Sequence, residues 1–183
     1  MTATTGDEVL SIYERCGAAA YFGEAVSVTE HGLQAAYFAQ ADGASDALVV
    51  AALLHDIGHL IESVPEDIAD WQRDARHELT GSRWLSRRFG PEVCEPVRLH
   101  VPAKRYLCAV DAGYFVLLSA ESVRTLSLQG GPMTAAEVTA FESLPHARDA
   151  VAVRRWDDQA KDPAVSPPRF AHFAPLLEAL ARS

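Results

Sequence analysis

The sequence has few strand signals, no concentrated basic surface and no long apolar run. No cluster of lysine and arginine is longer than a pair, and the formal net charge is −9. This composition argues against nucleic-acid binding, which needs a concentrated basic surface. The longest wholly apolar run, Ala47 to Leu54, has eight residues. It is far shorter than the roughly 20 residues of a membrane-spanning helix, so we expect no membrane association.

Paired cysteines and a signal peptide are also missing. Cys16, Cys94 and Cys108 are odd in number and show no Cys-x-x-Cys spacing, so we expect reduced thiols rather than disulfides or a cysteine metal site. The first residues lack the basic start and apolar core of a signal peptide. We therefore expect a cytoplasmic protein, and nothing in the sequence calls for an obligate protein partner.

Helical periods, caps and chain breakers account for most of the sequence and predict an all-α helical bundle. We expect a single domain over residues 1–183, with its core at roughly 8–160 and an extended tail with a short terminal helix at 161–183. Two capping boxes, Ser27-x-x-Glu30 and Thr134-x-x-Glu137, predict helix starts at residues 28 and 135. Apolar periodicity together with glycines and prolines predicts the other helices: 8–16, 46–57 with Gly58 as its cap, 73–89, Pro91 to about Pro102, 112–128, one from Pro145, and 175–182.

The segment that ends in His55 and Asp56 is the first candidate for a functional site. An apolar run precedes this pair, and His59 follows one helical turn after His55. Two imidazoles and a carboxylate in a water-excluding segment cost free energy unless something compensates them, and a metal ion does this best. Any one of them alone is read more simply as a core histidine or a capping aspartate. Together they favour metal binding.

Four further candidate ligands are spread along the chain: His31, His77, His100 and Asp157. Helices that cross in a bundle can direct such residues at one centre. With His55 and Asp56 they make six ligands, which are too many for one ion with open positions and suit two ions about 3.5–4 Å apart that share Asp56 as a bridge. The plainer alternatives are a surface role for His77, a core or capping role for His31, and a solvated helix end at Asp157.

The order His…His-Asp…Asp resembles the HD-domain superfamily of helical metalloproteins. Other segments resemble its mixed-valent diiron oxygenase branch, which cleaves carbon–phosphorus bonds of 1-hydroxyphosphonates. The HD pair alone is weakly specific, and the resemblance covers roughly residues 10–160. Its most specific segments are Tyr21-Phe22-Gly23-Glu24, Ala103-Lys104-Arg105-Tyr106-Leu107 and Gln129-Gly130-Gly131-Pro132-Met133.

This resemblance implies a site with two iron ions, Fe(II) and Fe(III). It implies ligands to the first iron from His31, His55, Asp56 and Asp157, and to the second from Asp56, His77 and His100. It also implies that Tyr21 is a further ligand of the second iron, which leaves when substrate arrives, and that Glu24 stabilises this tyrosine. For the phosphonate group it implies His59 and Lys104 as cations and Ser122 as a further donor. Arg105 and Arg155 are additional candidates.

The implied reaction consumes O₂ and cleaves a 1-hydroxy-2-(amino or trimethylammonio)ethylphosphonate to phosphate and glycine or glycine betaine. A trimethylated amine would favour an aromatic or acidic wall, for which Trp71, Tyr106 and Tyr114 are candidates. Two alternatives stay open at this point. One is a metal-dependent phosphohydrolase of a nucleotide or phosphate monoester, and the other is a non-catalytic regulator that binds a ligand.

Overall fold

The computed structural model describes residues 3–19, 21, 24–61 and 76–182, and these residues form no β-sheet. The all-α fold class is thus confirmed. Within the described residues, none of the helices is long and apolar enough to cross a membrane. The α-helices follow one another as α1 (Thr5–Cys16), α2 (Val28–Ala41), α3 (Asp46–Leu54), α4 (Ile57–Ile61), α5 (His77–Leu85), α6 (Pro91–Val110), α7 (Ala120–Leu128), α8 (Ala135–Glu142), α9 (Ala147–Gln159) and α10 (Phe170–Leu180).

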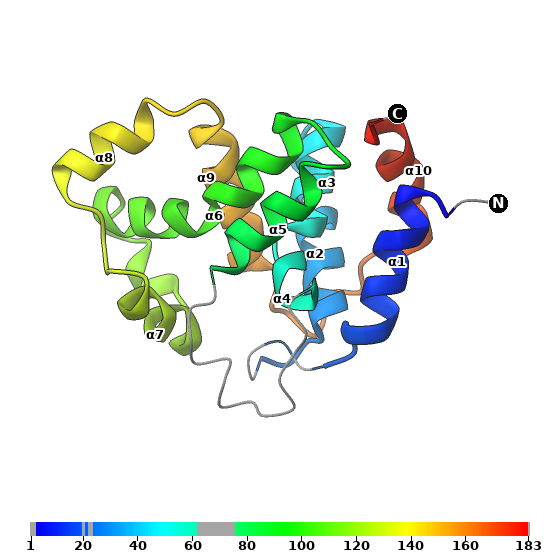
Figure 1. Ribbon diagram of the computed structural model, residues 1–183. Coiled ribbons are helices and arrows are strands. Elements are labelled where there is room, and N and C mark those ends of the chain that lie inside the picture. The colour runs from blue at the N-terminus through cyan, green and yellow to red at the C-terminus, as the bar shows by residue number, and fades with distance from the viewer. Residues whose placement is uncertain (1–2, 20, 22–23, 62–75, 183) are drawn as a thin grey trace.

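The apolar helix α3 lies at the centre of the bundle. Its residues from Val49 to Leu54 are buried, as expected for a helix that is apolar on most sides. Helices α2, α6, α9 and α10 all contact α3, and Figure 1 shows α2 and α3 behind α5 and α6. The residues that follow α3 in the chain therefore enter the most enclosed part of the molecule.

Both capping boxes form as predicted. The Ser27 hydroxyl accepts from the backbone N–H of Glu30 at 3.2 Å, and the Glu30 carboxylate accepts from the N–H of Ser27 at 2.8 Å. The same reciprocal pair joins Thr134 and Glu137. Helices α2 and α8 begin at the expected residues, because each capping box satisfies N–H groups that the first turn leaves without a partner.

The predicted helix 46–57 ends early, at Leu54. His55 and Asp56 form a turn, and α4 begins at Ile57. Gly58 is not a helix cap, since it lies inside α4. A Cβ added at Gly58 would collide with the carbonyl oxygen of His77. The missing side chain thus permits the close approach of α4 to α5.

Pro102 does not end its helix. Helix α6 continues from Pro91 to Val110 with Pro96 and Pro102 inside it. A proline in a helix interior costs about 3 kcal/mol, and the packing of α6 against α3, α5, α8 and α9 outweighs this cost. His100 therefore sits within a continuous helix rather than at its end.

Three other helix predictions are partly wrong. Residues 112–128 form the short 3₁₀ helix η2 (Phe115–Leu117) and then α7, which starts where the Ser119 hydroxyl accepts from a backbone N–H. The helix predicted at 175–182 is α10, which starts five residues earlier and contains Pro175. Helix α5 begins at His77 where 73 was predicted, although residues 73–75 lie outside the described part of the chain.

The hydrophobic core extends beyond residue 160. Phe170, Phe173 and Leu177 of α10 are buried in the same apolar cluster as α3. Helix α10 packs beside α1, and the two chain ends lie on the same side of the molecule (Figure 1). The residues after 160 therefore contribute directly to the packed interior.

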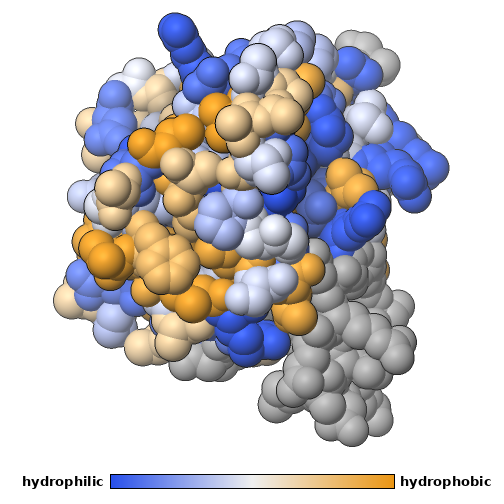
Figure 2. All heavy atoms as spheres, turned by 90° about the vertical axis from the view of Figure 1, so that its left-hand side faces the viewer, coloured by the Kyte–Doolittle hydropathy of each residue, from blue (hydrophilic) through white to orange (hydrophobic). Residues whose placement is uncertain are grey.

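The end of the molecule that carries α7 and α8 exposes apolar side chains between polar ones (Figure 2). Val116 and Leu117 of η2 are each 78% exposed. Phe115, which precedes them, is 45% exposed, so all three residues of η2 present apolar side chains at this end of the molecule.

Replacing Phe173 by alanine tests the contribution of α10 to the core. Phe173 is fully buried, so Phe173→Ala should lower the free energy of unfolding by about 3–5 kcal/mol. Urea unfolding followed by circular dichroism measures this loss. Phe115→Ala is the matched control because Phe115 is 45% exposed, and a loss of equal size in the two variants would contradict the assignment of α10 to the core.

Candidate metal centre

The Asp56 carboxylate stands between two groups of histidines. Its Oδ2 atom lies 3.7 Å from Nε2 of His31 and 3.5 Å from Nε2 of His55. Its Oδ1 atom lies 3.2 Å from Nε2 of His77 and 3.5 Å from Nε2 of His100. Each carboxylate oxygen thus faces a different pair of imidazoles, which is the arrangement that a ligand shared by two metal ions requires.

Asp157 joins the first pair of histidines. Its Oδ1 atom lies 3.4 Å from Nε2 of His31 and 3.8 Å from Nε2 of His55. His31 comes from α2, His55 follows α3, and Asp157 lies in the last turn of α9. All three are buried and can place one ligand atom each around a common point.

His77 and His100 approach each other on the other side of Asp56. Their Nε2 atoms are 3.1 Å apart, and the packing of α5 against α6 brings them together. His59 stacks on His77 with ring centroids 3.8 Å apart, and Asp56, His59 and His77 can also place three ligand atoms around one point. The geometry alone therefore leaves both His59 and His100 as candidate partners of His77.

Backbone carbonyl groups fix the orientation of three of the histidines. A carbonyl oxygen only accepts, so the Nδ1 atom that faces it must carry the proton, and the Nε2 lone pair is left pointing into the site. The Nδ1 to oxygen distances are 2.7 Å from His31 to Ala160, 2.8 Å from His55 to Ala52 and 2.7 Å from His100 to Val97.

These contacts leave two lone pairs facing each other. The Nε2 atoms of His31 and His55 are 3.1 Å apart, and neither carries a proton when both Nδ1 atoms donate. The facing Oδ1 of Asp157 is buried without a hydrogen-bond partner among the described residues. Buried acceptors without donors are costly, and a metal ion at this point would satisfy all three. The residues present therefore fit a metal ion.

Burial and charge keep these groups in the protonation states that metal binding needs. Burial lowers the pKa of His55 to about 4, so its imidazole is neutral. Burial alone would raise the pKa of Asp56, but His55, His100 and His77 hold it well below its usual range. Asp157 is likewise kept ionised against the effect of burial, chiefly by Arg154, whose Nη1 lies 2.7 Å from Oδ2.

Tyr21 lies on the side of Asp56 that faces His31 and His55, not beside His77 and His100 where the second iron was expected. Its ring stacks on His31 with centroids 3.7 Å apart, and its hydroxyl donates to Oδ2 of Asp56 at 2.8 Å. Burial, followed by the charge of Asp56, raises its pKa well above the usual range, so the phenol keeps its proton. The backbone N–H of Glu24 donates to the carbonyl of Tyr21 at 2.7 Å.

A cavity of about 70 Å³ opens beside Asp56, and the three residues expected to bind substrate, His59, Lys104 and Ser122, all line it. Lys104 is buried, and its Nζ donates to Oγ1 of Thr125 at 2.8 Å. Burial lowers the pKa of Lys104 to about 7. Burial and then His77 hold the pKa of His59 well below its usual range.

Four of the additional candidates do not line this cavity. Arg105 pairs with Glu137, and Arg155 pairs with Asp111 on the surface. Tyr106 and Tyr114 donate to Glu142 and to Asp158, respectively, outside the cavity. Trp71 lies outside the described residues.

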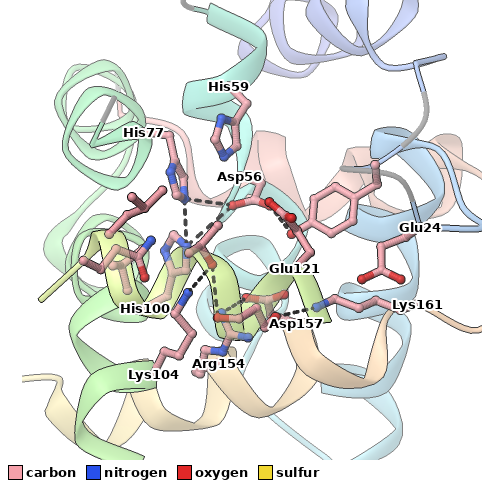
Figure 3. A pocket seen from close by; sticks show the side chains of 16 residues that line it. Glu24, Asp56, His59, His77, His100, Lys104, Glu121, Arg154, Asp157 and Lys161 are labelled. Carbon is pink, nitrogen blue, oxygen red and sulfur yellow. Dashed lines mark hydrogen bonds and ion pairs between the residues drawn. The ribbon is translucent and has the colours of Figure 1, made fainter. Parts of the chain in front are cut away.

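Sequence reasoning missed other lining residues, most clearly Arg154 and Lys161. Arg154 precedes Asp157 by three residues and Lys161 follows it by four. Both could have been found from the sequence, because residues one helical turn before and after a suspected ligand lie on the same face of a helix. Figure 3 shows both side chains directed toward the centre of the site, from the same part of the chain as Asp157.

The site thus defines an all-α protein with two groups of histidines and aspartates that could each hold a metal ion. Comparison with known proteins agrees with this class. The family model described as HD domain matches residues 28–134.

Two relatives extend the similarity to most of the chain. One is a hydroxymethylphosphonate dioxygenase of Gimesia maris, 41% identical over 97% of this chain and 90% of the relative. The other is a glycine-betaine-forming [1-hydroxy-2-(trimethylamino)ethyl]phosphonate dioxygenase of Leisingera caerulea, 41% identical over 91% of this chain and 85% of the relative. The chain belongs to the HD-domain family and, within it, to the group that contains these phosphonate dioxygenases.

Removing the Asp56 carboxylate should release metal from both groups of histidines at once. We expect Asp56→Ala to lose nearly all bound metal, because each of its oxygens faces one group. Metal per chain, measured by inductively coupled plasma mass spectrometry on folded protein, tests this. Asp149→Ala, which removes a carboxylate paired with His146 on the same helix as Asp157, should keep its metal. Retention of a full metal complement in Asp56→Ala would rule out the bridge.

Proposed function

We propose that the chain is a dioxygenase with two iron ions that cleaves the carbon–phosphorus bond of a 1-hydroxyphosphonate. The observation that carries this proposal is the position of Asp56, with one oxygen toward each pair of histidines. The names of the two relatives, both phosphonate dioxygenases, supply the reaction class. A cytoplasmic location and the absence of a nucleic-acid partner remain predictions of the sequence.

The proposed ligands divide into two sets that meet at Asp56. His31, His55 and Asp157 would complete the first iron site, and His77 and His100 the second. Imidazoles and carboxylates with open positions suit iron that must bind both a substrate and O₂. When bound, the iron pair would supply the redox chemistry and polarise the substrate oxygens.

Tyr21 would control access to this centre. Its hydroxyl occupies the side of Asp56 that faces His31 and His55, so a substrate that binds there must displace it. Glu24 lines the same cavity three residues later in the chain. We propose that Glu24 accepts a hydrogen bond from the displaced tyrosine or from the incoming substrate.

Lys104, His59 and Ser122 would bind the phosphonate group. Lys104 and Ser122 are buried in the cavity wall, while His59 is half-buried at the side of His77. A doubly charged anion placed beside Lys104 would favour its protonated form, because opposite charges at close range stabilise each other. Binding of the phosphonate would therefore raise the pKa of Lys104, which burial lowers in the free protein.

The reaction balances without a further reductant. A 1-hydroxyphosphonate R–CH(OH)–PO₃²⁻ and one O₂ give R–COO⁻ and H₂PO₄⁻. The C–P bond and one C–H bond break, carbon is oxidised to a carboxylate, and O₂ is the oxidant. The protein's own residues would orient the C1 hydroxyl and the phosphonate beside the iron pair and limit the entry of water.

Two carboxylates that line the cavity, Glu24 and Glu121, suit a free and a trimethylated amine alike, so a preference for the trimethylated one would need an aromatic face. Recognition of a quaternary ammonium uses aromatic faces. Among the described residues that line the cavity, Tyr21 is the one tyrosine, phenylalanine or tryptophan. It faces His31, and the Lys161 ammonium lies 5.9 Å from its centroid. Tyr21 therefore does not offer an open face to a second cation.

Phosphate release should depend on O₂. With the iron-loaded protein and hydroxymethylphosphonate, we expect phosphate release in air and a drop to background in an anaerobic chamber, with one O₂ consumed per phosphate. A phosphate assay beside an oxygen electrode measures both, with Asp56→Ala as the inactive control. Undiminished release without O₂ would favour the phosphohydrolase alternative and refute the proposal.

Three substrates assayed side by side should separate the possible R groups. We expect kcat/KM for hydroxymethylphosphonate and for the free-amine 1-hydroxyethylphosphonate to exceed that for the trimethylated compound by about tenfold. This ratio corresponds to the roughly 0.5–2 kcal/mol that an aromatic face contributes to binding a cation. A preference for the trimethylated substrate would show this reading of the cavity wall to be wrong.

A further inference from the structure

Lysine is rare in this chain, and its two positions are informative. Of the 16 basic residues, only Lys104 and Lys161 are lysines, and all others are arginines. Both lysines line the cavity beside Asp56. All other basic side chains are those of arginines, while the cavity is lined by two lysines that are 57 positions apart in the sequence.

The two lysines are held by one helix between them. Lys104 comes from α6, and its Nζ donates to Oγ1 of Thr125 at 2.8 Å. Lys161 follows α9, and its Nζ donates to Oγ of Ser122 at 3.1 Å. Ser122 and Thr125 are three residues apart on α7, so their side chains lie on the same face of that helix. The ammonium groups point inward from opposite sides of the cavity (Figure 3).

Two ammonium groups directed into one small cavity repel each other unless an anion lies between them. Among the described residues, no carboxylate oxygen lies within ion-pair distance of either Nζ. Arg154, the third basic residue in the wall, differs from them because Asp157 and Asp158 already neutralise it. The lysine charges are therefore left for a ligand.

The shape of the lysine side chain suits this position. Its ammonium is a compact charge with three donors on a flexible stem, whereas a guanidinium is a larger planar fork. In a cavity of about 70 Å³, two compact ammonium groups leave room for a tetrahedral phosphonate head group. Each ammonium has three donors and gives one of them to a hydroxyl of α7, so two remain on each lysine for the oxygens of such an anion.

We propose that Lys161 is a second binding residue for the phosphonate dianion, opposite Lys104, with Ser122 and Thr125 holding the two ammonium groups at their spacing. The identity of the anion rests on the proposed function. The role of Lys161 as an anion-binding residue rests on the cavity geometry. It makes phosphonate recognition depend on residue 161, which lies beyond the part of the chain that the HD-domain model matches.

A purely structural role for Lys161 predicts different behaviour. Lys161 lies four residues after Asp157 and its charge helps to keep that carboxyl ionised. If this were its whole contribution, loss of the ammonium would weaken metal binding and leave anion binding to the metal-loaded protein unchanged. The two roles are therefore separable by measuring metal content and anion affinity on the same samples.

Calorimetric titration of the iron-loaded protein with methylphosphonate and with inorganic phosphate tests the proposal. We expect Lys161→Met to weaken the Kd for both anions about tenfold to a hundredfold, as for the loss of a hydrogen bond to a charged group, with unchanged iron content. Arg155→Met is the matched control, since it removes one positive charge from the outer face of α9, where Arg155 pairs with Asp111. An unchanged Kd in Lys161→Met, or a loss of iron that alone explains the change, would overturn the proposal.

A second measurement uses the unaltered protein and does not depend on how a variant folds. The sequence holds only three primary amines, the two lysines and the N-terminus, so acetylation rates at each are resolved by mass spectrometry. Methylphosphonate should slow the acetylation of Lys161 and Lys104 about tenfold and leave that of the N-terminus unchanged. Slowing at Lys104 without any effect at Lys161 would contradict the proposal.

These outcomes are independent of turnover. Protection of Lys161 by methylphosphonate in a protein that releases no phosphate from hydroxyphosphonates would uphold the anion site and refute the proposed reaction. O₂-dependent phosphate release together with an unchanged anion Kd in Lys161→Met would uphold the proposed reaction and refute the role of Lys161.

Discussion

The rest of the structure depends on the burial of one carboxylate among histidines, three of which direct an Nε2 lone pair into the site. Asp56 is 5% exposed and is surrounded by imidazoles on both sides. Such a group is tolerated only when positive charge or donors compensate it. Tyr21 donates one hydrogen bond to Asp56, while backbone carbonyls hold the Nδ1 protons of His31, His55 and His100 and leave these three rings without a donor toward the site. Metal ions would supply the remaining compensation, and the helices bring together residues that could hold them.

The end of α9 supplies several groups of the site from neighbouring residues. Within five residues it supplies the Asp157 carboxylate, the Ala160 carbonyl that orients His31, and the Lys161 ammonium in the cavity. Arg154, one turn earlier, binds the oxygen of Asp157 that does not face the histidines. This single helix end thus sets the direction of a ligand oxygen, the tautomer of a ligand histidine and part of the charge that a substrate meets. Its packing against α2 and α6 fixes all three together.

The sequence was informative about the site because the ligands are chemically unusual at their positions. His55 and Asp56 interrupt a strongly apolar segment, and capping boxes marked the starts of α2 and α8 correctly. The errors arose where tertiary contacts decide the local structure. Pro102 lies inside α6 because packing on several helices outweighs its local cost. Gly58 is required by the nearby His77 carbonyl, a contact between residues 19 positions apart that no local pattern contains. The role of Lys161 could not be predicted because it depends on a hydrogen bond to Ser122 of α7, which is 39 positions away in the sequence.

The overall charge of the chain makes local cations necessary. A net charge of −9 repels a phosphonate dianion at a distance, but salt screens exposed charges beyond roughly 8 Å under physiological conditions. Inside the cavity the surroundings are less polarisable, so a nearby ammonium acts far more strongly than the distant surface carboxylates. Buried Asp56 and Asp157 would still oppose an anion there, and metal ions between them and the ligand would reverse that field. Metal binding and anion binding are therefore linked electrostatically: the same carboxylates that attract the ions exclude the substrate until the ions are in place.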